Sequence, residues 1–492
     1  MSTKICRLSG AEFEVEDRDL AFYERVSPSF SGRRYEIPPP TLCPEMRLRR
    51  RLSFRNQIYL FTRPSSTSGK TIFSLFPEDA SFPVIDHTEW WSDSWDALQH
   101  GRDFDFSRPF FEQFMALRNS VPHPGRPGVN FDNSDFCANG ANLKNCYLLF
   151  NSAHCEECSF CETTWHSVNC MECTDLRKSE LCYDCTACTN CYALQSSQYC
   201  ENCSSSYFLL NCRGCSDCFG CVNLRRKQYC FFNKQLTKDE YFERLQALEL
   251  ASYRERSAIE EKVLAFWKQH PRPHAIYRQV EDVTGNSIAE AKNVHDSYFV
   301  EQAEDVRFGF LLSDGAHDCY DLTVPGIKAE RIYEGLQVGI NAYNVCFSWF
   351  CADGCSNLFY CDYSVGAKNC FGCSGIKHKE YCIFNKQYSK QEYEALSSKI
   401  AEHMINTREW GEFYPAEHSP VPYNYTLAAR YFPLSKQQAQ QQGLRWLEKP
   451  SIQSADAIAA DQLPDISTEQ KDTCIVRSRS SDRAFKISSF EL

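Results

Sequence analysis

Cysteine is the residue type with which this chain could do chemistry, and its positions are regular. The chain of 492 residues holds 29 cysteines, and eighteen of them lie between Cys137 and Cys230. Every gap between neighbouring cysteines in that block is 3 or 9 residues. Eight more cysteines lie between Cys319 and Cys382. A shared phase of this kind is typical of a short structural repeat whose thiols point in one direction.

Paired thiols in the first block could hold a metal. Two sets share the spacing Cys-x2-Cys-x11-Cys-x2-Cys, which is typical of zinc sites with four ligands in a tetrahedron. The softness of thiolates also suits copper(I) or an iron–sulfur cluster, so zinc is the first of three candidate cofactors. The candidate ligands are Cys155, Cys158, Cys170 and Cys173 in the first set, and Cys185, Cys188, Cys200 and Cys203 in the second.

Two other interpretations of the thiols stay open. Cysteine is a small and often buried residue, so it could simply fill a narrow interior. Valine, leucine and isoleucine replace cysteine in the second block, which favours this packing role. Disulfide rungs would require an oxidising compartment, whereas the first residues have no secretory character. We therefore expect a cytoplasmic protein with reduced thiols.

The spacing also predicts the elements that position the thiols. Motifs such as NVHDSY and NVCFSW recur at steps of twelve or thirteen positions between Asn293 and Ser374. Units this short cannot hold a helical hairpin. They are long enough to form extended coils that stack ~4.8 Å apart. We expect a mainly β fold, a parallel β-solenoid with coils of roughly 12 to 15 residues. A 15-residue period predicts one inward column of Cys155, Cys170, Cys185, Cys200, Cys215 and Cys230. In the second block, the expected column is Val294, Val306, Cys319, Ile332, Val345, Leu358 and Cys370.

The two blocks end alike, which indicates a duplicated Cys-rich solenoid. CFGCVNLRRKQYCFFNKQLTKDEYFERL parallels CFGCSGIKHKEYCIFNKQYSKQEYEAL. Each segment ends in a capping box, Thr237 with Glu240 and Ser389 with Glu392, and a capping box predicts a helix start. A helix over the end of each solenoid would cover its unpaired strand edge.

These patterns divide the chain into four segments. Residues 1–130 are rich in proline, arginine and aromatic residues and predict an α+β domain. Residues 131–270 and 271–410 hold the two solenoids, near 134–235 and 293–388, each with its capping helix. Residues 411–492 contain a Pro-rich extension, a flexible linker and a partial copy of the N-terminal motif. In that copy Cys474 matches Cys6, and Phe485 with Ile487 matches Phe13 with Val15.

Arginines cluster in the segment PPPTLCPEMRLRRRLSFRN and could bind the phosphates of a nucleic acid. A solvated helix face is the alternative, and the net charge of −11 opposes a protein that coats nucleic acid. No apolar run approaches ~20 residues, so no membrane span is expected. The clustered residues are Arg47, Arg49, Arg50, Arg51 and Arg55.

Carboxylates offer little sign of catalysis. Asp103 and Asp105 in GRDFDFSRPFFEQF could form a carboxylate pair, but a solvated turn before an aromatic helix explains them better, since no partner base can be named. A β-helix enzyme acting on a polymer would require a column of acidic or basic residues on one outer face. The repeats have no such column.

Several longer segments together resemble an uncharacterised cysteine-rich bacterial family, sometimes loosely labelled as a CoA-transferase. These segments are PTLCPEMRLRRRLSFRN, WWSDSWDALQHGRDFDFSRPFFEQF, NCYLLF, CFGCVNLRRKQYCFFNKQLTKDEY, EYCIFNKQYSKQEYEAL and WGEFYPAEHSPVPYN. No acyl-transfer constellation accompanies that label here.

The resemblance implies a zinc-ribbon-like N-terminal domain, because members of that family carry paired cysteines three residues apart there. A structural zinc site requires four ligands, and only two of the eight matching positions are cysteine. We therefore expect residues 1–130 to form a degenerate domain that holds no zinc. The matching pairs are Cys6 with Ser9, Cys43 with Met46, Ser65 with Ser68, and Asp86 with Glu89.

The sequence thus predicts a non-enzymatic scaffold that binds a protein partner, with thiolate metal in the first solenoid as an additional expectation. The alternatives are the β-helix enzyme and a nucleic-acid-associated protein that uses Arg47 to Arg55.

Overall fold

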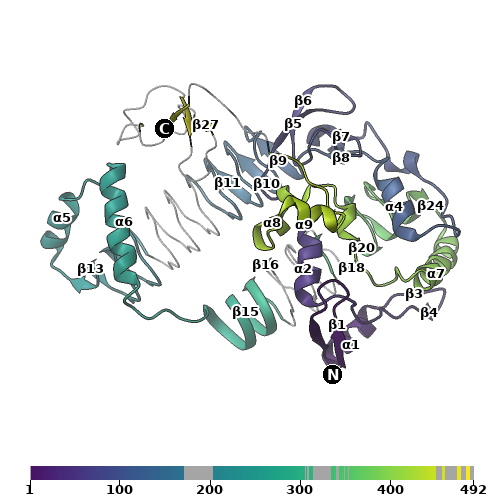
Figure 1. Ribbon diagram of the computed structural model, residues 1–492, viewed down its shortest axis with the longest axis horizontal. Coiled ribbons are helices and arrows are strands. Elements are labelled where there is room, and N and C mark those ends of the chain that lie inside the picture. The colour runs from purple at the N-terminus through teal and green to yellow at the C-terminus, as the bar shows by residue number, and fades with distance from the viewer. Residues whose placement is uncertain are drawn as a thin grey trace. The chain divides into compact units, whose positions relative to one another are not determined.

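The computed structural model describes residues 2–170, 203–304, 306, 310–313, 334–338, 343–347, 350–352, 354–449, 457–459, 462, 474–477 and 484–487. The chain forms two compact units (Figure 1). Unit 1 contains Met1–Pro127 and Pro273–Leu447, and unit 2 contains Gly128–Arg272 and Glu448–Leu492. The N-terminal region therefore folds together with the second solenoid, a grouping that the division into four segments does not include.

The fold is mainly β, and its main feature is a parallel β-solenoid. In unit 2 the strand register places Leu143 beside Cys155 and Cys218 beside Cys230, so one coil advances the chain by 12 positions. The strands of unit 2 are β9 (Gly128–Asp132), β10 (Gly140–Lys144), β11 (Ala153–Glu156), β12 (Ser216–Phe219), β13 (Gln228–Phe231) and β14 (Lys234–Gln235), with β25 (Ile458–Ala459), β26 (Cys474–Arg477) and β27 (Ala484–Ile487) near the C-terminus.

Each coil has four corners, because every third residue has a left-handed backbone. Asparagine tolerates this conformation better than most residues, which explains the many asparagines in the repeats. The residue after each corner is buried in the coil interior, as Leu143, Cys146 and Leu149 are. The left-handed residues in this stretch are Asn142, Asn145, Leu148, Asn151, His154, Glu157, Phe160, Thr163, His166 and Asn169.

The 12-residue coil corrects the expected 15-residue columns. The 15-residue period equals one coil of 12 residues plus one side of three residues. Cysteines 15 positions apart therefore all point inward, but they lie on different sides of the coil. Cys155 therefore lies beside Leu143 in the register rather than in a column with Cys170. Gaps of three and nine positions equal one and three sides of the coil, so each gap brings the chain to another inward position. The sequence period thus reported which residues point inward, but not which of them stack.

The solenoid of unit 1 follows the expected column where it is described. Val345 pairs with Leu358, Leu358 with Cys370, and Cys370 with Cys382. The step from Val345 to Leu358 spans 13 positions and the next two steps span 12, and the asparagine corner bonds on the same coils have the matching separations of 13 and 12 positions. Val294 and Val306 are also fully buried, whereas Cys319 and Ile332 lie outside the described residues.

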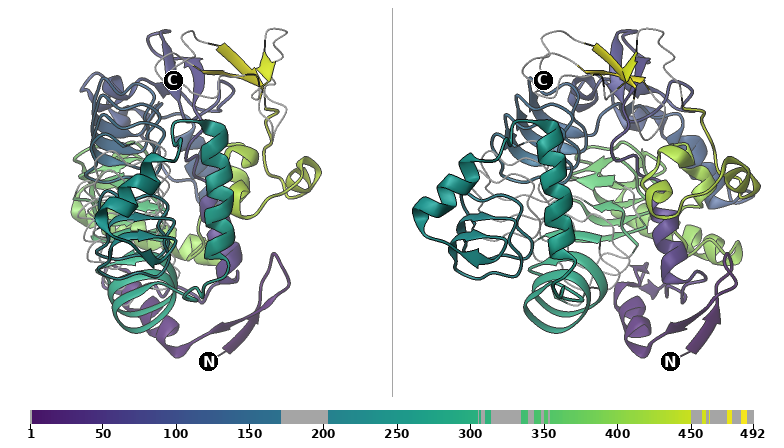
Figure 2. Two further views of the ribbon diagram at one scale, coloured as in Figure 1. Left: turned by 90° about the vertical axis from the view of Figure 1, so that its left-hand side faces the viewer. Right: turned by 60° about the vertical axis from the view of Figure 1, so that its left-hand side comes forward.

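Each solenoid ends in a helix that begins at the expected capping box. The last parallel strand first turns back as an antiparallel hairpin, β13–β14 in unit 2 and β23–β24 in unit 1. Thr237 then caps α5 (Lys238–Gln246) and Ser389 caps α7 (Lys390–Asn406). A further helix, α6 (Tyr253–Trp267), packs with α5 against Phe208, Phe219 and Val222 of the last coils of unit 2 (Figure 2). The helix starts predicted at the two capping boxes are confirmed.

The N-terminal region of unit 1 consists of short antiparallel hairpins, one parallel strand pair (β7 with β8) and helices. Its elements are β1 (Ser2–Ile5), β2 (Glu12–Val15), α1 (Asp17–Val26), β3 (Ser29–Phe30), β4 (Arg33–Arg34), α2 (Pro44–Leu52), β5 (Phe61–Pro64), β6 (Thr71–Ser74), β7 (Val84–Ile85), α3 (His87–Trp91), η1 (Ala97–His100), α4 (Phe110–Arg118) and β8 (His123–Pro124). The zinc-ribbon resemblance of this region stays a prediction.

The remaining elements of unit 1 are the coils and a C-terminal group of short helices. The strands are β15 (Tyr277–Glu301), β16 (Phe310–Ser313), β17 (Gln337–Val338), β18 (Tyr343–Cys346), β19 (Phe350–Ala352), β20 (Ser356–Phe359), β21 (Ser364–Val365), β22 (Lys368–Phe371), β23 (Glu380–Ile383) and β24 (Lys386–Gln387). The helices after α7 are η2 (Ala416–His418), η3 (Tyr423–Tyr425), α8 (Leu427–Tyr431) and α9 (Lys436–Gln441).

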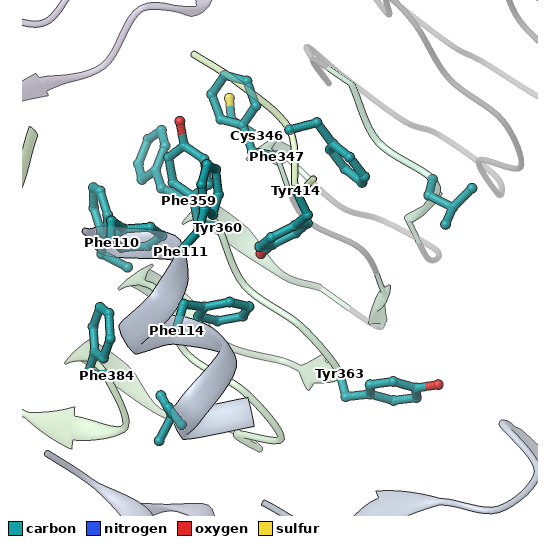
Figure 3. Packing of buried hydrophobic residues seen from close by; sticks show 14 of the residues in the cluster. Phe110, Phe111, Phe114, Cys346, Phe347, Phe359, Tyr360, Tyr363, Phe384 and Tyr414 are labelled. Atoms are coloured by element: carbon teal, nitrogen blue, oxygen red, sulfur yellow. The ribbon is translucent and has the colours of Figure 1, made fainter. Parts of the chain in front are cut away.

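An aromatic core joins the N-terminal region to one outer face of the unit 1 solenoid (Figure 3). The ring of Phe110 in α4 lies 5.1 Å from the ring of Tyr360 and 5.4 Å from that of Phe384. Phe30 lies 5.5 Å from Phe359 in the same way. Edge-on and tilted aromatic contacts at these distances stabilise a core beyond simple area burial. The solenoid of unit 1 is therefore covered by its own chain on this face.

Candidate functional site: the thiol-lined solenoid interior

The inward positions of unit 2 form a thiol-lined interior. The described cysteines between Cys137 and Cys230 are all at most 3 % exposed. Cys146, Cys158 and Cys170 occupy one side of successive coils, whereas Cys155 occupies the neighbouring side. Chemistry at these sulfurs would therefore have to take place inside the solenoid.

The thiols donate hydrogen bonds to the backbone in a repeating pattern. The acceptor carbonyls lie two residues earlier and nine residues later. The Cys155 Sγ lies 3.4 Å from the carbonyl oxygens of both Ala153 and Thr164, and the Cys158 Sγ lies 3.4 Å from that of Ser167. The single thiol proton can be donated to either carbonyl, so these contacts favour the neutral thiol over the thiolate.

Inward side chains also accept hydrogen bonds from the coil above. At several inward positions the backbone N–H donates to an inward side chain of the adjacent coil. Ser134 Oγ accepts from Cys146 N–H at 3.0 Å, and Ser152 Oγ accepts from Thr164 N–H at 3.1 Å. Cys137 Sγ accepts from Leu149 N–H at 3.4 Å. Buried backbone groups need such partners, which explains why small polar residues occupy these positions.

The eight predicted metal ligands are only partly described. Cys155, Cys158, Cys170 and Cys203 lie inside the solenoid, and the other four (Cys173, Cys185, Cys188 and Cys200) lie outside the described residues. Contact with the Cys146 thiol, followed by the Cys155 and Cys170 thiols and by burial, raises the pKa of Cys158. Within the described ranges, no three or more His, Cys, Asp or Glu side chains are arranged to hold a metal ion.

The outer corners of unit 2 carry ladders of paired polar side chains. Asn130 donates to Asn142 at 2.7 Å, and Asn133 donates to Asn145 at 2.8 Å. The next corner of the first column is His154, whose ring stacks on that of His166 with centroids 4.7 Å apart. These residues satisfy one another from coil to coil, and the described columns hold no pair of carboxylates suited to acid–base catalysis.

The predicted arginine cluster lies mostly inside unit 1. Arg47, Arg50, Arg51 and Arg55 are buried, and α2 carries the first three. Arg50 donates to Glu334 at 2.7 and 2.8 Å and to Glu412 at 2.9 Å. These guanidinium groups therefore point into the protein rather than towards a nucleic acid or bulk water.

Other contacts of the cluster are also internal. Arg47 donates to the hydroxyl of Tyr23 at 3.2 Å. The guanidinium of Arg49, which is partly exposed, lies over the ring of Tyr423 at 5.6 Å and hydrogen-bonds to Gln442. The sequence contained no signal for these partners, because each follows or precedes the arginines by many residues.

Sequence reasoning also missed a buried ion pair. Arg118 at the end of α4 donates to Asp362 of the solenoid at 2.7 Å, and the two side chains are 2 % and 0 % exposed. Burial raises the pKa of Asp362 to about 6, although Arg118 opposes this shift. Glu409 similarly accepts from the N–H groups of Phe110 and Phe111, both at 2.8 Å, at the start of α4. Both contacts attach α4 to the rest of unit 1.

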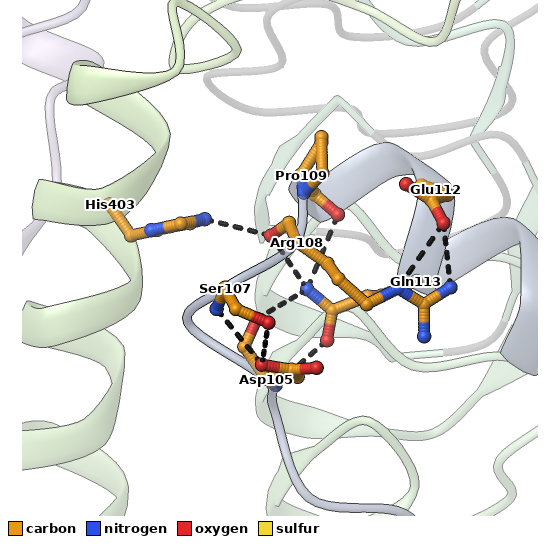
Figure 4. A network of polar contacts seen from close by, with 7 residues as sticks. All are labelled: Asp105, Ser107, Arg108, Pro109, Glu112, Gln113 and His403. Atoms are coloured by element: carbon orange, nitrogen blue, oxygen red, sulfur yellow. Dashed lines mark hydrogen bonds and ion pairs between the residues drawn. The ribbon is translucent and has the colours of Figure 1, made fainter.

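Asp103 and Asp105 take separate structural roles. Asp103 is exposed and pairs with Lys386 at 2.7 Å. Asp105 accepts from Ser107 N–H and Oγ at 2.9 and 2.7 Å, in the turn before α4 (Figure 4). His403 of α7 contacts the carbonyl of Arg108 in the same network. The interpretation as a turn before an aromatic helix agrees with these contacts.

Two cysteines outside the solenoids meet in the N-terminal region. Cys6 follows β1, and Cys43 is the residue that caps α2. The hydroxyl of Ser9 lies 3.7 Å from the Cys43 Sγ. Burial by itself raises the pKa of the Cys6 thiol, but hydrogen bonds from Ser9 and from the Cys43 backbone outweigh it and lower the pKa to about 6.

The C-terminal hairpin resembles β1–β2 in its strands but not in its cysteine. β26 and β27 are antiparallel with Ile475 opposite Lys486 and Arg477 opposite Ala484, and the connection between them has the same length as that between β1 and β2. Cys474 pairs with Ile487 inside the hairpin. The predicted match of Cys474 to Cys6 is therefore wrong, because Cys6 lies in the turn.

The fold defines the class of protein as a parallel β-solenoid with a thiol-lined interior. No family model, no curated protein and no solved structure matches the chain. In the part of the chain that the structure describes, no helix combines the length and the apolar character needed to cross a membrane.

Proposed function

We propose that this protein is a non-enzymatic scaffold that binds a protein partner on the outer corners of its solenoid. The observation that supports this proposal is the ladder of mutually paired side chains on the described coils, Asn130 with Asn142 and His154 with His166. Such a ladder forms a regular surface of hydrogen-bonding groups that needs little reorganisation to bind. The amides of this ladder cannot serve as a general acid or base.

Site-specific photo-crosslinking tests the proposal. A photoreactive amino acid replaces His154 on the outer corner, and in a matched control it replaces Gln437, an exposed residue of α9. Crosslinked proteins are then identified by mass spectrometry in extracts of the native host. We expect one partner to be captured from position 154 and not from position 437. The same proteins captured from both positions would contradict a dedicated binding face.

We further propose that the solenoid thiols are reduced and serve packing and backbone hydrogen bonding. A cytoplasmic location agrees with reduced thiols, and the carbonyl contacts of Cys155 and Cys158 favour the protonated form. Elemental analysis of purified protein, with thiols counted before and after denaturation, is the test. Stoichiometric zinc lost only on denaturation would instead favour the metal interpretation.

The two alternative functions have less support. A nucleic-acid-binding protein would use Arg47 to Arg55, but four of the five are buried. A β-helix enzyme would need a column of charged residues free to act on substrate, whereas carboxylates on the described coils pair with their neighbours, as Glu157 does with Asn145 and Glu290 with Arg278. The similar endings of the two solenoids, each with a hairpin and a capped helix, support a duplication within the chain, which we propose together with membership of the cysteine-rich family.

A further inference from the structure

The last coils of the two solenoids are built alike, position by position. Asn233 and Asn385 each accept, through the side-chain carbonyl, from a backbone N–H of the previous coil, that of Val222 at 2.9 Å and that of Ser374 at 2.8 Å. Both bonds span 11 positions, so the residues between these partners can be compared directly. A basic run occupies the same positions in both coils: Arg225, Arg226 and Lys227 in unit 2 match Lys377, His378 and Lys379 in unit 1.

In unit 1, the segment WWSDSWD (Trp90–Asp96) of the same chain contacts this basic run. The Lys377 ammonium lies 4.9 and 4.7 Å from the ring centroids of the first and last tryptophans of the segment. The same ammonium donates to two backbone carbonyls of the segment. Lys379 pairs with the carboxylate of Asp96 at 3.6 Å. The partner of the basic run in unit 1 is therefore an acidic peptide segment that carries tryptophan.

The matching run in unit 2 is open to solvent. Arg225, Arg226 and Lys227 are exposed, whereas Lys377 and Lys379 are half-buried. In the part of unit 2 that the structure describes, no carboxylate forms an ion pair with the two arginines or the lysine of this run. Its positive charge is therefore available to a carboxylate from outside the chain.

The neighbouring coil adds positive charge beside this run. Arg213 lies opposite Arg225 in the parallel register, and like charges placed opposite one another are destabilising. Arg225 also donates to the backbone and side-chain oxygens of Asn211, the side-chain oxygen at 3.3 Å. An anionic ligand would reduce the repulsion between the two arginines. Because Asn211 already orients the Arg225 guanidinium, binding would cost less conformational entropy.

One corner differs between the two units and limits where such a ligand can lie. Asn223 takes the place of Gly375, and its amide donates to the carbonyl of Pro271 at 2.9 Å. A Cβ atom added to Gly375 would lie 3.1 Å from the ring of Trp95. A ligand tryptophan on unit 2 must therefore lie farther from this corner than Trp95 does in unit 1, and over the Arg225 guanidinium instead. Guanidinium groups stack on aromatic faces at least as readily as ammonium groups do.

We propose that Arg225, Arg226 and Lys227 bind an acidic, tryptophan-bearing peptide segment of a partner protein. The tryptophan ring lies over the Arg225 guanidinium, and carboxylates of the segment pair with Arg226 and Lys227. The inference rests on the scaffold function proposed above and names one of its binding faces and the class of peptide bound there. Single-stranded RNA, the alternative ligand of a basic run, has no counterpart in unit 1, where the basic run contacts a peptide segment.

Peptide binding by the full-length protein tests the face. A fluorescein-labelled peptide with the sequence of residues 86–99, DHTEWWSDSWDALQ, is titrated with the protein, and its fluorescence anisotropy is measured. We expect saturable binding to the wild type and about tenfold weaker binding to Arg225→Glu/Lys227→Glu. The matched control Lys238→Glu/Lys262→Glu makes the same charge change at exposed positions of α5 and α6, and should bind the peptide like the wild type.

Variants of the peptide test the ligand chemistry without changing the protein. Trp90→Ala/Trp95→Ala and Asp93→Asn/Asp96→Asn in the peptide should each weaken binding, and a single-stranded oligouridylate should not displace the peptide.

Four outcomes would overturn the inference: a wild type that does not bind the peptide, equal binding by the wild type and Arg225→Glu/Lys227→Glu, an equal loss in Lys238→Glu/Lys262→Glu, or displacement by the oligouridylate. None of them changes the result of crosslinking from position 154, so the scaffold function and this binding face can fail separately.

Discussion

At the scale of single residues, the solenoid cysteines combine two properties that no other small residue offers together. They are apolar enough to fill a narrow interior, and their Sγ–H groups reach backbone carbonyls. Serine occurs at equivalent inward positions, Ser134 and Ser152, with its hydroxyl in similar bonds. Cysteine and serine therefore both donate hydrogen bonds to buried backbone carbonyls, and cysteine in addition makes apolar contacts.

Substitutions of Cys158 separate packing from hydrogen bonding. Cys158 is fully buried and its thiol contacts the Ser167 carbonyl. We expect Cys158→Ala to lower the free energy of unfolding by about 1–2 kcal/mol, since it loses both the contact volume and the donor. Cys158→Ser should cost less, because the hydroxyl replaces the donor. Urea unfolding with and without a chelator measures both, and a chelator-sensitive loss would show that Cys158 binds metal.

The ion pair of Arg118 and Asp362 makes the stability of unit 1 depend on pH. Burial raises the pKa of Asp362 from 3.8 to about 6, so the folded protein binds a proton there that the unfolded chain releases. This proton stabilises the fold fully below pH 3.8, and the stabilisation is lost as the pH rises through about 6.

Comparison with Asp362→Asn isolates this carboxyl group, since asparagine does not titrate. Between about pH 4 and pH 7 the wild type should lose on the order of 2 kcal/mol of unfolding free energy relative to the variant. Denaturant unfolding at several pH values is the measurement. A difference between the two proteins that stays constant over this range would mean that Asp362 ionises at its ordinary pKa.

At the scale of elements, a capped helix follows the last hairpin of each solenoid and packs against its last parallel strand. α7 begins with a reciprocal pair, in which Ser389 Oγ accepts from Glu392 N–H at 3.3 Å and the Glu392 carboxylate accepts from Ser389 N–H at 3.0 Å. The helix then buries Tyr393, Ile400 and Met404 in the aromatic core. Its local start and its tertiary contacts therefore support each other.

Removal of the cap should weaken the end of the solenoid. We expect Ser389→Ala to cost about 1 kcal/mol of unfolding free energy, the usual loss for an N-cap side chain. Hydrogen exchange in β23 and β24 should become faster, because α7 protects this end. Lys399→Ala, a change at an exposed position of the same helix, is the control and should change neither quantity. Equal effects of the two substitutions would contradict a capping role for Ser389.

At the scale of the whole molecule, the two units differ in what covers their coils. In unit 2 the aromatic residues of the last coils, such as Phe219, pack against α5 and α6 from the directly following chain. In unit 1 the corresponding face packs against Phe30 and Phe110, which lie far earlier in the sequence. The coils of unit 1 therefore depend on the N-terminal region.

Fragment expression tests this difference. A fragment of residues 128–272 contains its own covering helices and should be soluble and folded by circular dichroism. A fragment of residues 273–447 should aggregate, because it exposes the aromatic face around Phe359 and Tyr360. Co-expression with residues 1–127 should restore its solubility. A soluble, cooperatively unfolding 273–447 fragment would show that the N-terminal region is not required.

The sequence by itself determined the local features. The regular cysteine gaps identified the inward positions, since side-chain direction in these coils depends only on the three-residue step. The capping boxes at Thr237 and Ser389 predicted both helix starts, because each box is complete within four residues.

Only the tertiary structure decided which positions meet. The 15-residue cysteine period predicted which cysteines point inward, but not which side of the coil each one occupies. The 12-residue strand register was needed to show which residues stack on one another. The partners of the arginines also depended on the fold: Arg50 meets Glu334 across 284 positions, and Arg118 meets Asp362 across 244. A basic run predicts an exposed surface because charge is costly to bury, and the carboxylates of Glu334 and Glu412, which offset this cost at Arg50, are brought to it only by the fold.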